Sequence, residues 1–324
     1  MDIEARRARR ESQRRSVRRR RLSVGLLAAL AVAVLAIVLL AGHSGGGGQG
    51  TAPTASAGST SAHLRAGSAQ TAAAGARTGA LSGPPGTAPV PILMYHVIAP
   101  APAGAPFPGL YVEPQEFAEQ MQALKQAGWH AVTLDEVEAY WQRGVPLGTA
   151  KPIVLSFDNG YHSQYAQALP VLRSLGWVGD ENLQLSGLPP SQGGLSQEEI
   201  RGLLAAGWEL DTQGISHADL ITLDAEQLHY QVAVARQLLQ QRFHVPVNWF
   251  CYPSGHYDPT VVAAVRDAGF TGSTTVVPGW AHPSDDRYRL PRLRVLGGTS
   301  ATALLSLLAA VREDPPAPVS YNGT

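Results

Sequence analysis

The sequence predicts an α/β fold, a closed or nearly closed (β/α) barrel over residues 88–312, preceded by one transmembrane helix and a flexible linker. Three observations predict it. Short apolar runs alternate with amphipathic helical stretches, which is typical of a parallel sheet wrapped by helices. The body of about 225 residues has the length of one such barrel. Polar clusters follow four apolar runs, and such barrels place their chemistry at the C-terminal ends of strands.

The N-terminal segment predicts a membrane anchor. Residues 1–21 carry ten arginines against three acidic residues, and residues 22–42 contain neither charge nor proline. A helix of that length spans roughly 30 Å, one hydrocarbon core, whereas the apolar region of a cleaved signal peptide is usually about 7 to 15 residues long. The arginines predict a single-pass protein of the cell membrane, with a cytoplasmic N-terminus and an extracytoplasmic C-terminal domain.

The remaining composition sets further limits. Residues 43–87 are mostly Gly, Ala, Ser, Thr and Pro, which predicts a flexible linker, and residues 313–324 form a C-terminal tail. Beyond residue 21 the chain has 15 basic and 22 acidic residues, a net charge of −7 that argues against nucleic acid as a partner. Cys251 is the single cysteine, so no internal disulfide can form, and its apolar strand predicts a buried, inert thiol.

Within the body, periodicity predicts each element in turn. The expected strands are residues 90–95, 130–134, 152–157, 208–210, 247–252 and 270–277. The expected helix signals are Pro114 in the first turn of 113–127, capping boxes at Thr133/Glu136 and Ser196/Glu199, Asp258 before Pro259, and an apolar face along 224–243. The polar strand ends are Tyr95 to His96, Asp158 to Asn159, Asp211 to His217 and Tyr252 to Gly255.

Five sequence blocks carry a resemblance to a known family. They are PILMYHVI (91–98), IVLSFDNGYHSQY (153–165), GWELDTQGISHADL (207–220), VPVNWFCYPSGHYD (245–258) and LPRLRV (290–295). Their order and spacing resemble polysaccharide deacetylases of carbohydrate esterase family four, in the branch that opens with a PILMYH-like strand. The resemblance implies an irregular (β/α) barrel that hydrolyses N- or O-acetyl groups of cell-wall or exopolysaccharide sugars. It also implies a divalent metal, usually zinc, that polarises the acetyl carbonyl and acidifies a bound water.

The resemblance also assigns residues to the site. Asp158 matches the general base, and His217 matches the second metal-binding histidine. Asn159 stands where the family has a metal-binding Asp, and Gln213 stands where it has the first histidine. The family also has a histidine late in the sequence that acts as general acid. It has no counterpart here, since no histidine follows Arg292, and His282 is at best a displaced substitute.

The predicted substrate groove is formed by residues that follow the strand ends. They are His96, Tyr161, Tyr252, Pro253, Gly255, Trp280 and Arg292. Tyr161, Tyr252 and Trp280 are candidates for stacking on a sugar ring, with core packing as the equal alternative for all three. Core packing is the expected role of Trp129, Trp177, Trp208 and Trp249. The histidines at 162, 229 and 244 fall on helical positions, where solvated surface is expected.

The two substituted ligands leave the function open. Asn159 and Gln213 offer only neutral carbonyl oxygens, so zinc or a similar divalent metal is expected to bind weakly or not at all. A rebuilt site could use Asp158 as a ligand, with Asp211, His162 or His96 beside His217. The hypotheses are therefore a deacetylase with an altered metal site, a glycan-binding pseudoenzyme, and a structural role in the envelope. The expected partners are an acetylated polysaccharide or peptidoglycan-like glycan, and the membrane through the N-terminal helix.

Overall fold

The computed structural model describes residues 83–186, 188 and 193–313. The predicted basic tail, membrane span and most of the linker lie outside these residues, as does the chain beyond residue 313. Within the described ranges, no helix combines the length and the apolar composition that crossing a membrane requires. The last linker residues pack on the body, because Gly86 N donates to Tyr140 O over 2.9 Å.

Parallel strands form one curled sheet with the order β7-β6-β5-β4-β3-β1-β8, while β2 pairs with the start of β3. The strands are β1 (Ile92–Tyr95), β2 (His130–Ala131), β3 (Pro152–Asn159), β4 (Asp180–Leu183), β5 (Glu209–Thr212), β6 (Trp249–Cys251), β7 (Gly272–Thr274) and β8 (Leu293–Arg294). An isolated parallel bridge joins Thr274 at the end of β7 to Leu290, just before β8. The sheet is therefore a half-barrel whose two outer strands are drawn toward each other.

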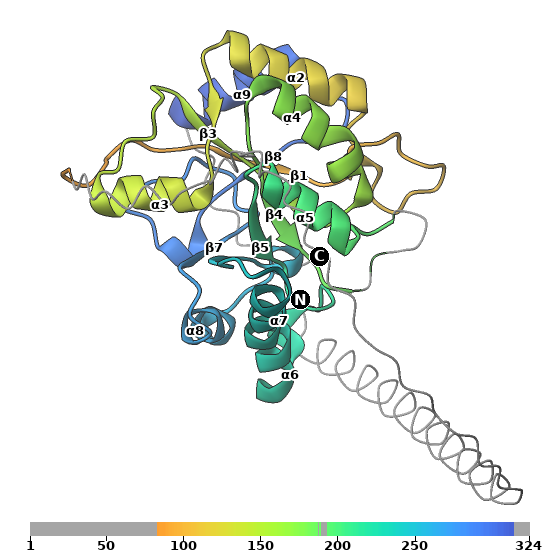
Figure 1. Ribbon diagram of the computed structural model, residues 1–324, viewed down its shortest axis with the longest axis vertical. Helices are drawn as coiled ribbons and strands as arrows, with labels where there is room; N and C mark the ends of the chain where they lie inside the picture. The colour runs from red at the N-terminus through yellow and green to blue at the C-terminus, as the bar shows by residue number, and fades with distance from the viewer. Residues whose placement is uncertain (1–82, 187, 189–192, 314–324) are drawn as a thin grey trace, which may run out of the picture. The chain divides into compact units, whose positions relative to one another are not determined.

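Helices connect the strands and cover the outside of the sheet (Figure 1). They are α2 (Pro114–Gln126), α3 (Leu134–Arg143), α4 (Leu169–Leu175), α5 (Gln197–Ala205), α6 (Ala225–His229), α7 (Ala235–Phe243), α8 (Pro259–Asp267) and α9 (Ala301–Glu313). Short 3₁₀ turns are η1 (Pro108–Leu110), η3 (Leu220–Thr222), η5 (Pro253–Gly255) and η6 (Arg287–Arg289), and π turns are η2 (Gln164–Ala168) and η4 (Tyr230–Val234). Helices α2, α4 and α9 lie together on one side, as Figure 1 shows.

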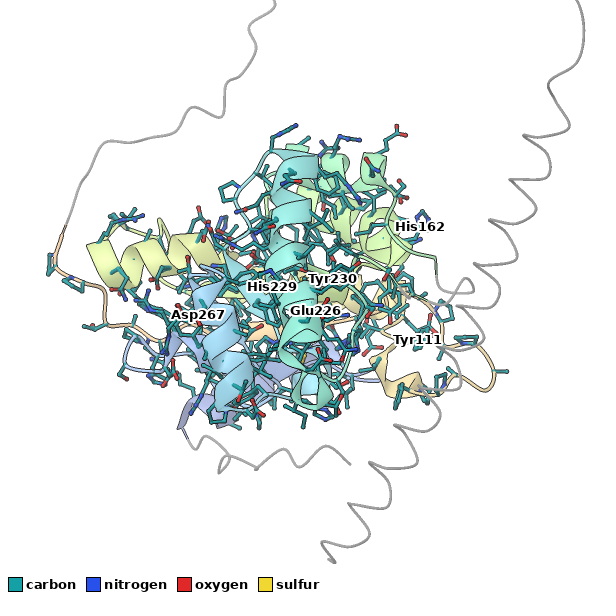
Figure 2. The ribbon with its side chains drawn as sticks, turned by 90° about the horizontal axis from the view of Figure 1, so that it is seen from below. Tyr111, His162, Glu226, His229, Tyr230 and Asp267 are labelled. Atoms are coloured by element: carbon teal, nitrogen blue, oxygen red, sulfur yellow. The ribbon has the colours of Figure 1, made fainter. Side chains whose placement is uncertain are left out.

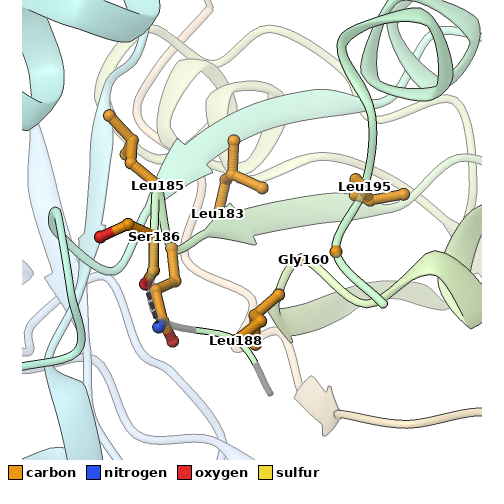
Figure 3. Close-up of a pocket in the computed structure, with 8 residues that line it drawn as sticks. Gly160, Leu183, Leu185, Ser186, Leu188 and Leu195 are labelled. Carbon is orange, nitrogen blue, oxygen red and sulfur yellow. Dashed lines mark hydrogen bonds between the residues drawn. The ribbon is translucent and has the colours of Figure 1, made fainter. Parts of the chain in front are cut away.

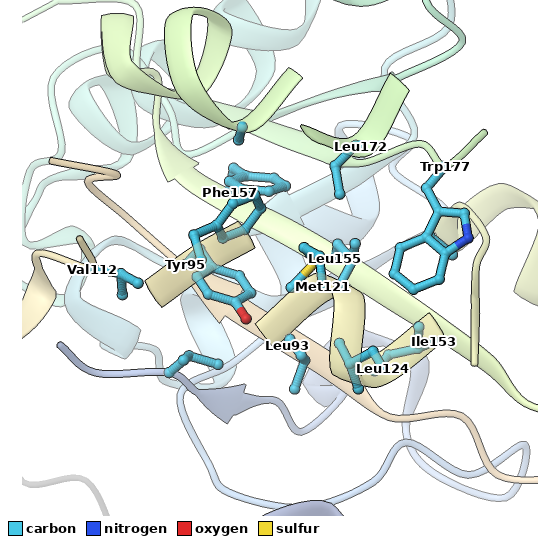
Figure 4. Close-up of a cluster of buried hydrophobic side chains, with 14 of the residues drawn as sticks. Leu93, Tyr95, Val112, Met121, Leu124, Ile153, Leu155, Phe157, Leu172 and Trp177 are labelled. Carbon is cyan, nitrogen blue, oxygen red and sulfur yellow. The ribbon is translucent and has the colours of Figure 1, made fainter. Parts of the chain in front are cut away.

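The two faces of the sheet differ in chemistry. The outer face packs under the helices and is apolar: Leu93, Leu155 and Phe157 lie in a buried cluster with Met121 of α2 (Figure 4). On the same strands, Ser156 and Asp158 face the interior of the half-barrel, because successive side chains of a strand point to opposite faces. The fold is stabilised mainly by the apolar layer, which leaves the interior free to hold polar groups.

The sequence predicted most of these elements correctly. Both capping boxes form, with Thr133 and Ser196 accepting from the backbone three residues later, and Asp258 caps α8. The predicted helix 224–243 is present but interrupted by the π turn η4. Strand β4 was missed because its sequence, DENL, carries polar residues on the interior-facing positions and a buried Glu181 on the other face.

Candidate active site

Asp158 lies at the C-terminal end of β3, inside the half-barrel, with 1% of its surface exposed. Its Oδ1 accepts from Arg292 Nη1 over 2.7 Å and from Asn182 Nδ2 over 2.9 Å, and its Oδ2 accepts from Arg292 Nη2 over 2.9 Å. Burial alone would raise the pKa of this carboxyl, but the charge and hydrogen bonds of Arg292 outweigh it and lower the pKa to about 2. Asp158 is therefore an ionised carboxylate held by a bidentate guanidinium.

Arg292 is a central member of this cluster, and it does not line a groove wall as the sequence had suggested. It is 1% exposed, and besides Asp158 it donates to Thr275 O over 2.9 Å and to Ser156 Oγ over 3.0 Å. Its Nη2 also contacts Cys251 Sγ at 3.2 Å. The Arg292 guanidinium thus compensates the Asp158 charge from within the barrel. The position of Arg292 in the sequence did not reveal this role.

His96, which follows β1, lies on the other side of Asp158. Its Nε2 is 3.8 Å from Asp158 Oδ2, while its Nδ1 is buried without a partner among the described residues. Burial lowers the pKa of His96 to about 4, although the Asp158 charge opposes the shift. The imidazole is therefore neutral near pH 7 and presents one unused ring nitrogen.

Two neutral amides lie at the positions where the resemblance predicted metal ligands. Asn159 adopts a left-handed backbone (φ 82°), a conformation that Asn and Asp tolerate better than most residues, and its Nδ2 donates to Gln184 Oε1 over 3.1 Å. Gln213 Nε2 lies 3.4 Å from Asp158 Oδ2 and 3.2 Å from Cys251 Sγ. Gln213 Oε1 is buried without a partner in the described structure. The Gln213 amide therefore serves Asp158 as a hydrogen-bond donor.

His217 lies beyond β5 in a left-handed turn (φ 53°) and is half-buried. Burial lowers the pKa of its imidazole, and the charge of Asp158 acts in the opposite direction. The structure thus brings Asp158, Asn159, Gln213 and His217 to one end of the sheet, as the sequence predicted.

The residues present do not fit a zinc ion. Zinc sites combine thiolate, imidazole and carboxylate ligands, whereas His217 is accompanied here by two amides and by a carboxylate that Arg292 already holds with both oxygens. Among the described residues, the group of three His, Cys, Asp or Glu side chains with converging ligand atoms is Asp180, Glu209 and Asp211, and it contains no member of this site. No step through a metal is derived for this site.

Three residues that the sequence offered as substitutes for the missing site residues lie elsewhere. Asp211 faces the interior further down β5 and accepts from Trp249 N over 2.8 Å. His162 is on the surface, where its Nδ1 lies 2.6 Å from Glu199 Oε1 (Figure 2). His282 belongs to the segment that bridges to Val90, which precedes β1, so it is at the opposite end of the sheet from Asp158. None of the three lies with His217.

The predicted stacking residues separate into two groups. Tyr161 packs with Val97 and Tyr111 at the end of the sheet that carries Asp158. Tyr252 packs in the outer core and donates to Tyr288 O over 2.9 Å, and Trp280 packs under α9 and donates to Leu308 O over 3.2 Å. Tyr252 and Trp280 are therefore core residues, and Tyr161 is the aromatic side chain that the structure leaves near the site.

The other predicted positions lie as follows. Pro253 and Gly255 are buried in turn η5, where Gly255 has φ 72° and a Cβ would lie 2.3 Å from Val276 Cγ2. His229 and His244 are exposed, as expected for surface histidines, and Figure 2 shows His229 on α6. Cys251 is buried, and burial raises the pKa of its thiol to about 12, which agrees with an unreactive side chain.

A pocket of about 230 Å³ opens beside Asn159 (Figure 3). It is lined by Gly160, Leu183, Gln184, Leu185, Ser186, Leu188, Gly194 and Leu195. Gly160 is required there, because a Cβ at its left-handed backbone (φ 89°) would lie 2.4 Å from Leu183 Cδ1. Gln184 connects the pocket to the site, since it accepts from Asn159 and donates to Ser186 O.

The sequence did not reveal several residues of the hydrogen-bond network around Asp158. Ser156, Asn182 and Gln184 all lie on or just after strands, and their hydrogen bonds hold Arg292, Asp158 and Asn159. The available signal was the alternation of polar residues in LSFD and DENLQ, which marks an interior face that is itself polar.

Comparisons with known proteins agree with this geometry. The profile described as polysaccharide deacetylase matches residues 148–273, which include β3, β4, β5 and β6. The body of the chain is thus similar to the polysaccharide deacetylase family. A Bacillus subtilis (strain 168) relative that carries this family's name, YxkH, is 26% identical over 225 residues, 69% of this chain and 78% of the relative. The family resemblance found in the sequence is thereby confirmed.

Solved structures share the fold. The Streptococcus pyogenes deacetylase PplD, in complex with acetate, has a TM-score of 0.63 and 24% identity over 68% of this chain and 98% of that chain. IcaB from Ammonifex degensii has a TM-score of 0.57 and 23% identity over 68% of this chain and 96% of that chain. The curled parallel sheet with helices on its outside is therefore a fold that this chain shares with both structures.

Proposed function

We propose that this polysaccharide deacetylase-family protein acts on acetylated glycans outside the cytoplasm, anchored by residues 22–42, with a site too poor in ligands to hold zinc firmly. One observation carries the proposal. Gln213 takes the place of a metal-binding histidine and directs its amide nitrogen at Asp158 and Cys251, so it acts as a donor to the site. A site arranged in this way favours recognition of a glycan over rapid hydrolysis.

The pKa of Asp158 supports slow chemistry. A general base works best when its pKa lies near the operating pH, and the bidentate pair with Arg292 lowers that of Asp158 to about 2. His96, neutral near pH 7 and with a free Nδ1, is available to accept or donate a hydrogen bond at the same site. Its position allows it to orient a sugar acetamide without a metal.

A second candidate function is glycan binding without turnover. The pocket beside Asn159 favours it, because Gln184 and Ser186 offer polar atoms between leucine side chains, the mixture that a sugar with polar edges and apolar faces requires. Tyr161 lies at the same end of the sheet. This function needs neither a metal nor a good base.

The two functions are separated by metal content and turnover. Detergent-purified full chain is assayed for zinc by mass spectrometry, for acetate release from chitopentaose, and for binding of the same oligosaccharide. We expect substoichiometric zinc, little or no acetate, and measurable binding. Stoichiometric zinc together with turnover that Asp158→Ala abolishes would overturn the weak-metal proposal.

Restoration tests the cause directly. We expect Asn159→Asp with Gln213→His to raise zinc affinity by at least about two orders of magnitude, since each replaced ligand is worth at least tenfold. The matched control is Asn182→Asp with Gln184→His, which places the same residue types at interior positions of the neighbouring strand. Equal zinc binding by the parent and the restored variant would show that the ligand alignment is wrong.

A further inference from the structure

A second group of buried acids lies in the half-barrel, away from Asp158. Asp180 and Glu209 are the first residues of β4 and β5 and pair with each other in the sheet, and Asp211 follows two residues later. Asp158 lies near the end of β3, opposite Asn182, which in turn pairs with Asp211. The acidic group (Asp180, Glu209 and Asp211) therefore lies on the β4–β5 side of the interior, with Asp211 level with Asp158 and the other two acids two residues nearer the start of the strands.

Backbone donors hold each carboxylate by one oxygen. Leu134 N and Asp135 N, in the first turn of α3, donate to Asp180 Oδ2 over 2.9 Å and to Glu209 Oε2 over 3.0 Å. Trp249 N donates to Asp211 Oδ1 over 2.8 Å. Two elements, α3 and β6, thus fix the orientation of the three side chains, and the N-terminus of α3 favours negative charge on two of them.

One oxygen of each carboxylate lies without a backbone donor. Asp180 Oδ1, Glu209 Oε1 and Asp211 Oδ2 are all buried and lack a hydrogen-bond partner among the described residues, while the Glu209 carboxyl also interacts with the Thr133 hydroxyl and with the Asp211 carboxyl. Asp180 and Asp211 are 0% exposed. None of the three acids forms an ion pair with a described Lys, Arg or His, in contrast to Asp158. Buried oxygens of this kind are costly unless a cation or a proton compensates them.

The spacing of the ligand atoms suits a hard cation. One ligand atom from each of the three residues lies within 4.8 Å of the other two. Two oxygens on opposite sides of a Ca²⁺ ion, each at about 2.4 Å, are separated by about 4.8 Å, and Mg²⁺ draws its ligands slightly closer. Carboxylate oxygens are the ligands that both ions prefer.

We propose that Asp180, Glu209 and Asp211 form a structural site for a hard divalent cation, Ca²⁺ or Mg²⁺, which links β4 and β5 to the N-terminus of α3. The site is independent of the function proposed for the Asp158 end and uses none of its residues. Its occupant neutralises three carboxylates that have no other counter-charge, and it connects a helix to two central strands.

A shared proton is the competing explanation. Burial and the neighbouring carboxylate of Glu209 raise the pKa of Asp180 and of Asp211, and burial with the charge of Asp135 raises that of Glu209 to about 8. Protons bound at these carboxyls could replace the cation. The two explanations differ in whether an added divalent ion binds and stabilises the protein.

The test is binding to chelator-stripped, detergent-purified full chain. Ca²⁺ and Mg²⁺ are titrated by calorimetry, and Mn²⁺ is used as a paramagnetic probe of the number of sites. We expect one site, and a thermal midpoint that rises by about 5 °C or more at saturating Ca²⁺. In Asp211→Asn, which keeps an acceptor oxygen for Trp249 N, we expect affinity to fall at least about tenfold and the midpoint shift to disappear.

Two control variants locate the effect. Asp267→Asn removes an exposed acid from the end of α8 (Figure 2) and should leave affinity unchanged. His217→Ala alters the Asp158 end and should also leave Ca²⁺ binding unchanged. Absence of Ca²⁺ and Mg²⁺ binding by the parent would overturn the proposal in favour of shared protons. Binding that survives Asp211→Asn but is lost in His217→Ala would overturn it in favour of the other site.

Discussion

Two groups of buried carboxylates in the half-barrel interior are held in opposite ways. Asp158 meets a fixed guanidinium and two amide groups, and its pKa falls to about 2. Asp180, Glu209 and Asp211 meet backbone N–H groups and one another, and their pKa values rise. Both groups are almost fully buried, so burial alone does not decide the charge. The counter-charge does.

The packing of the sheet explains why the interior of the half-barrel can be polar. The apolar outer face of the sheet packs under the helices, so the inner face is not needed for the main hydrophobic core. Polar side chains there must be compensated locally, by Arg292 at Asp158 and by backbone donors at the acidic group. A substitution of one compensating group should therefore affect mainly the carboxylates that this group contacts.

Removal of Arg292 should have the largest effect. Arg292→Met leaves the Asp158 charge buried without its bidentate partner, and breaking a buried pair in this way costs about 3–5 kcal/mol. We expect the free energy of unfolding, measured in urea, to fall by that amount. Arg294→Met, at the exposed neighbouring position of β8, should change it by less than about 0.5 kcal/mol.

The charge itself can be separated from packing. Adding Asp158→Asn to Arg292→Met removes the unpaired charge, so the double variant should be more stable than Arg292→Met alone. A double variant as unstable as, or less stable than, Arg292→Met would mean that Arg292 matters through its packing and its bonds to Thr275 and Ser156.

In buffer free of divalent ions, the acidic group should make the folded protein less stable as the pH rises. The folded-state pKa of Glu209, about 8, lies above its ordinary value of 4.5, so the folded state binds more protons between these limits. Stability is then fully present below about pH 4.5 and is lost as the pH rises through about 8. The pKa values of Asp180 and Asp211 are also raised, so these two residues add to the trend.

Glu209→Gln tests this prediction. The variant keeps an acceptor for Asp135 N but cannot ionise, so the loss between pH 5 and 8.5 should shrink by roughly 2 kcal/mol. Unfolding in urea at several pH values measures it, with Glu119→Gln on the exposed face of α2 as the control. An unchanged slope in Glu209→Gln would show that Glu209 is already ionised in the folded protein.

His96 and Asp158 should make the folded protein less stable as the pH falls. Burial lowers the pKa of His96 to about 4 from an ordinary value of 6.5, so the unfolded chain binds the proton first. The contribution is present above pH 6.5 and is lost as the pH falls through about 4, and that of Asp158 is lost further down, through about 2.

His96→Gln should reduce the loss of stability in this acidic pH range. We expect the fall between pH 6.5 and 4.5 to decrease by about 1–2 kcal/mol, measured by urea unfolding. His229→Gln, an exposed residue of α6, is the matched control and should leave this loss unchanged. An equal slope of stability against pH in the parent, His96→Gln and His229→Gln would show that another group titrates in this range.

Sequence patterns predicted the outer layer better than the interior. Helix caps and apolar periodicity are local signals, and both capping boxes formed as expected. Asp158, Asn159, Gln213 and His217 converged because the ends of parallel strands meet at one edge.

The misses share a physical cause. Strand β4 has polar residues where an interior face is usually apolar, and Arg292 reaches Asp158 from 134 residues away. Tyr252 and Trp280 were assigned to the groove from their positions in the chain, but their side chains point to the outer core. Which face a strand-end residue takes depends on register, and register is set by the whole sheet.

The smallest predicted effect concerns the link between α3 and the acidic group. Thr133 caps α3, and its hydroxyl also bonds to Glu209, while the next two backbone N–H groups hold Asp180 and Glu209. Thr133→Ala should cost about 1 kcal/mol for the cap, plus several tenths of a kcal/mol for the loosened acids. Ser196→Ala removes the same capping box from α5, which has no such link, and should cost only the cap. Equal losses in urea unfolding would show that the first turn of α3 and the acidic group are energetically independent, because the two caps differ in this contact.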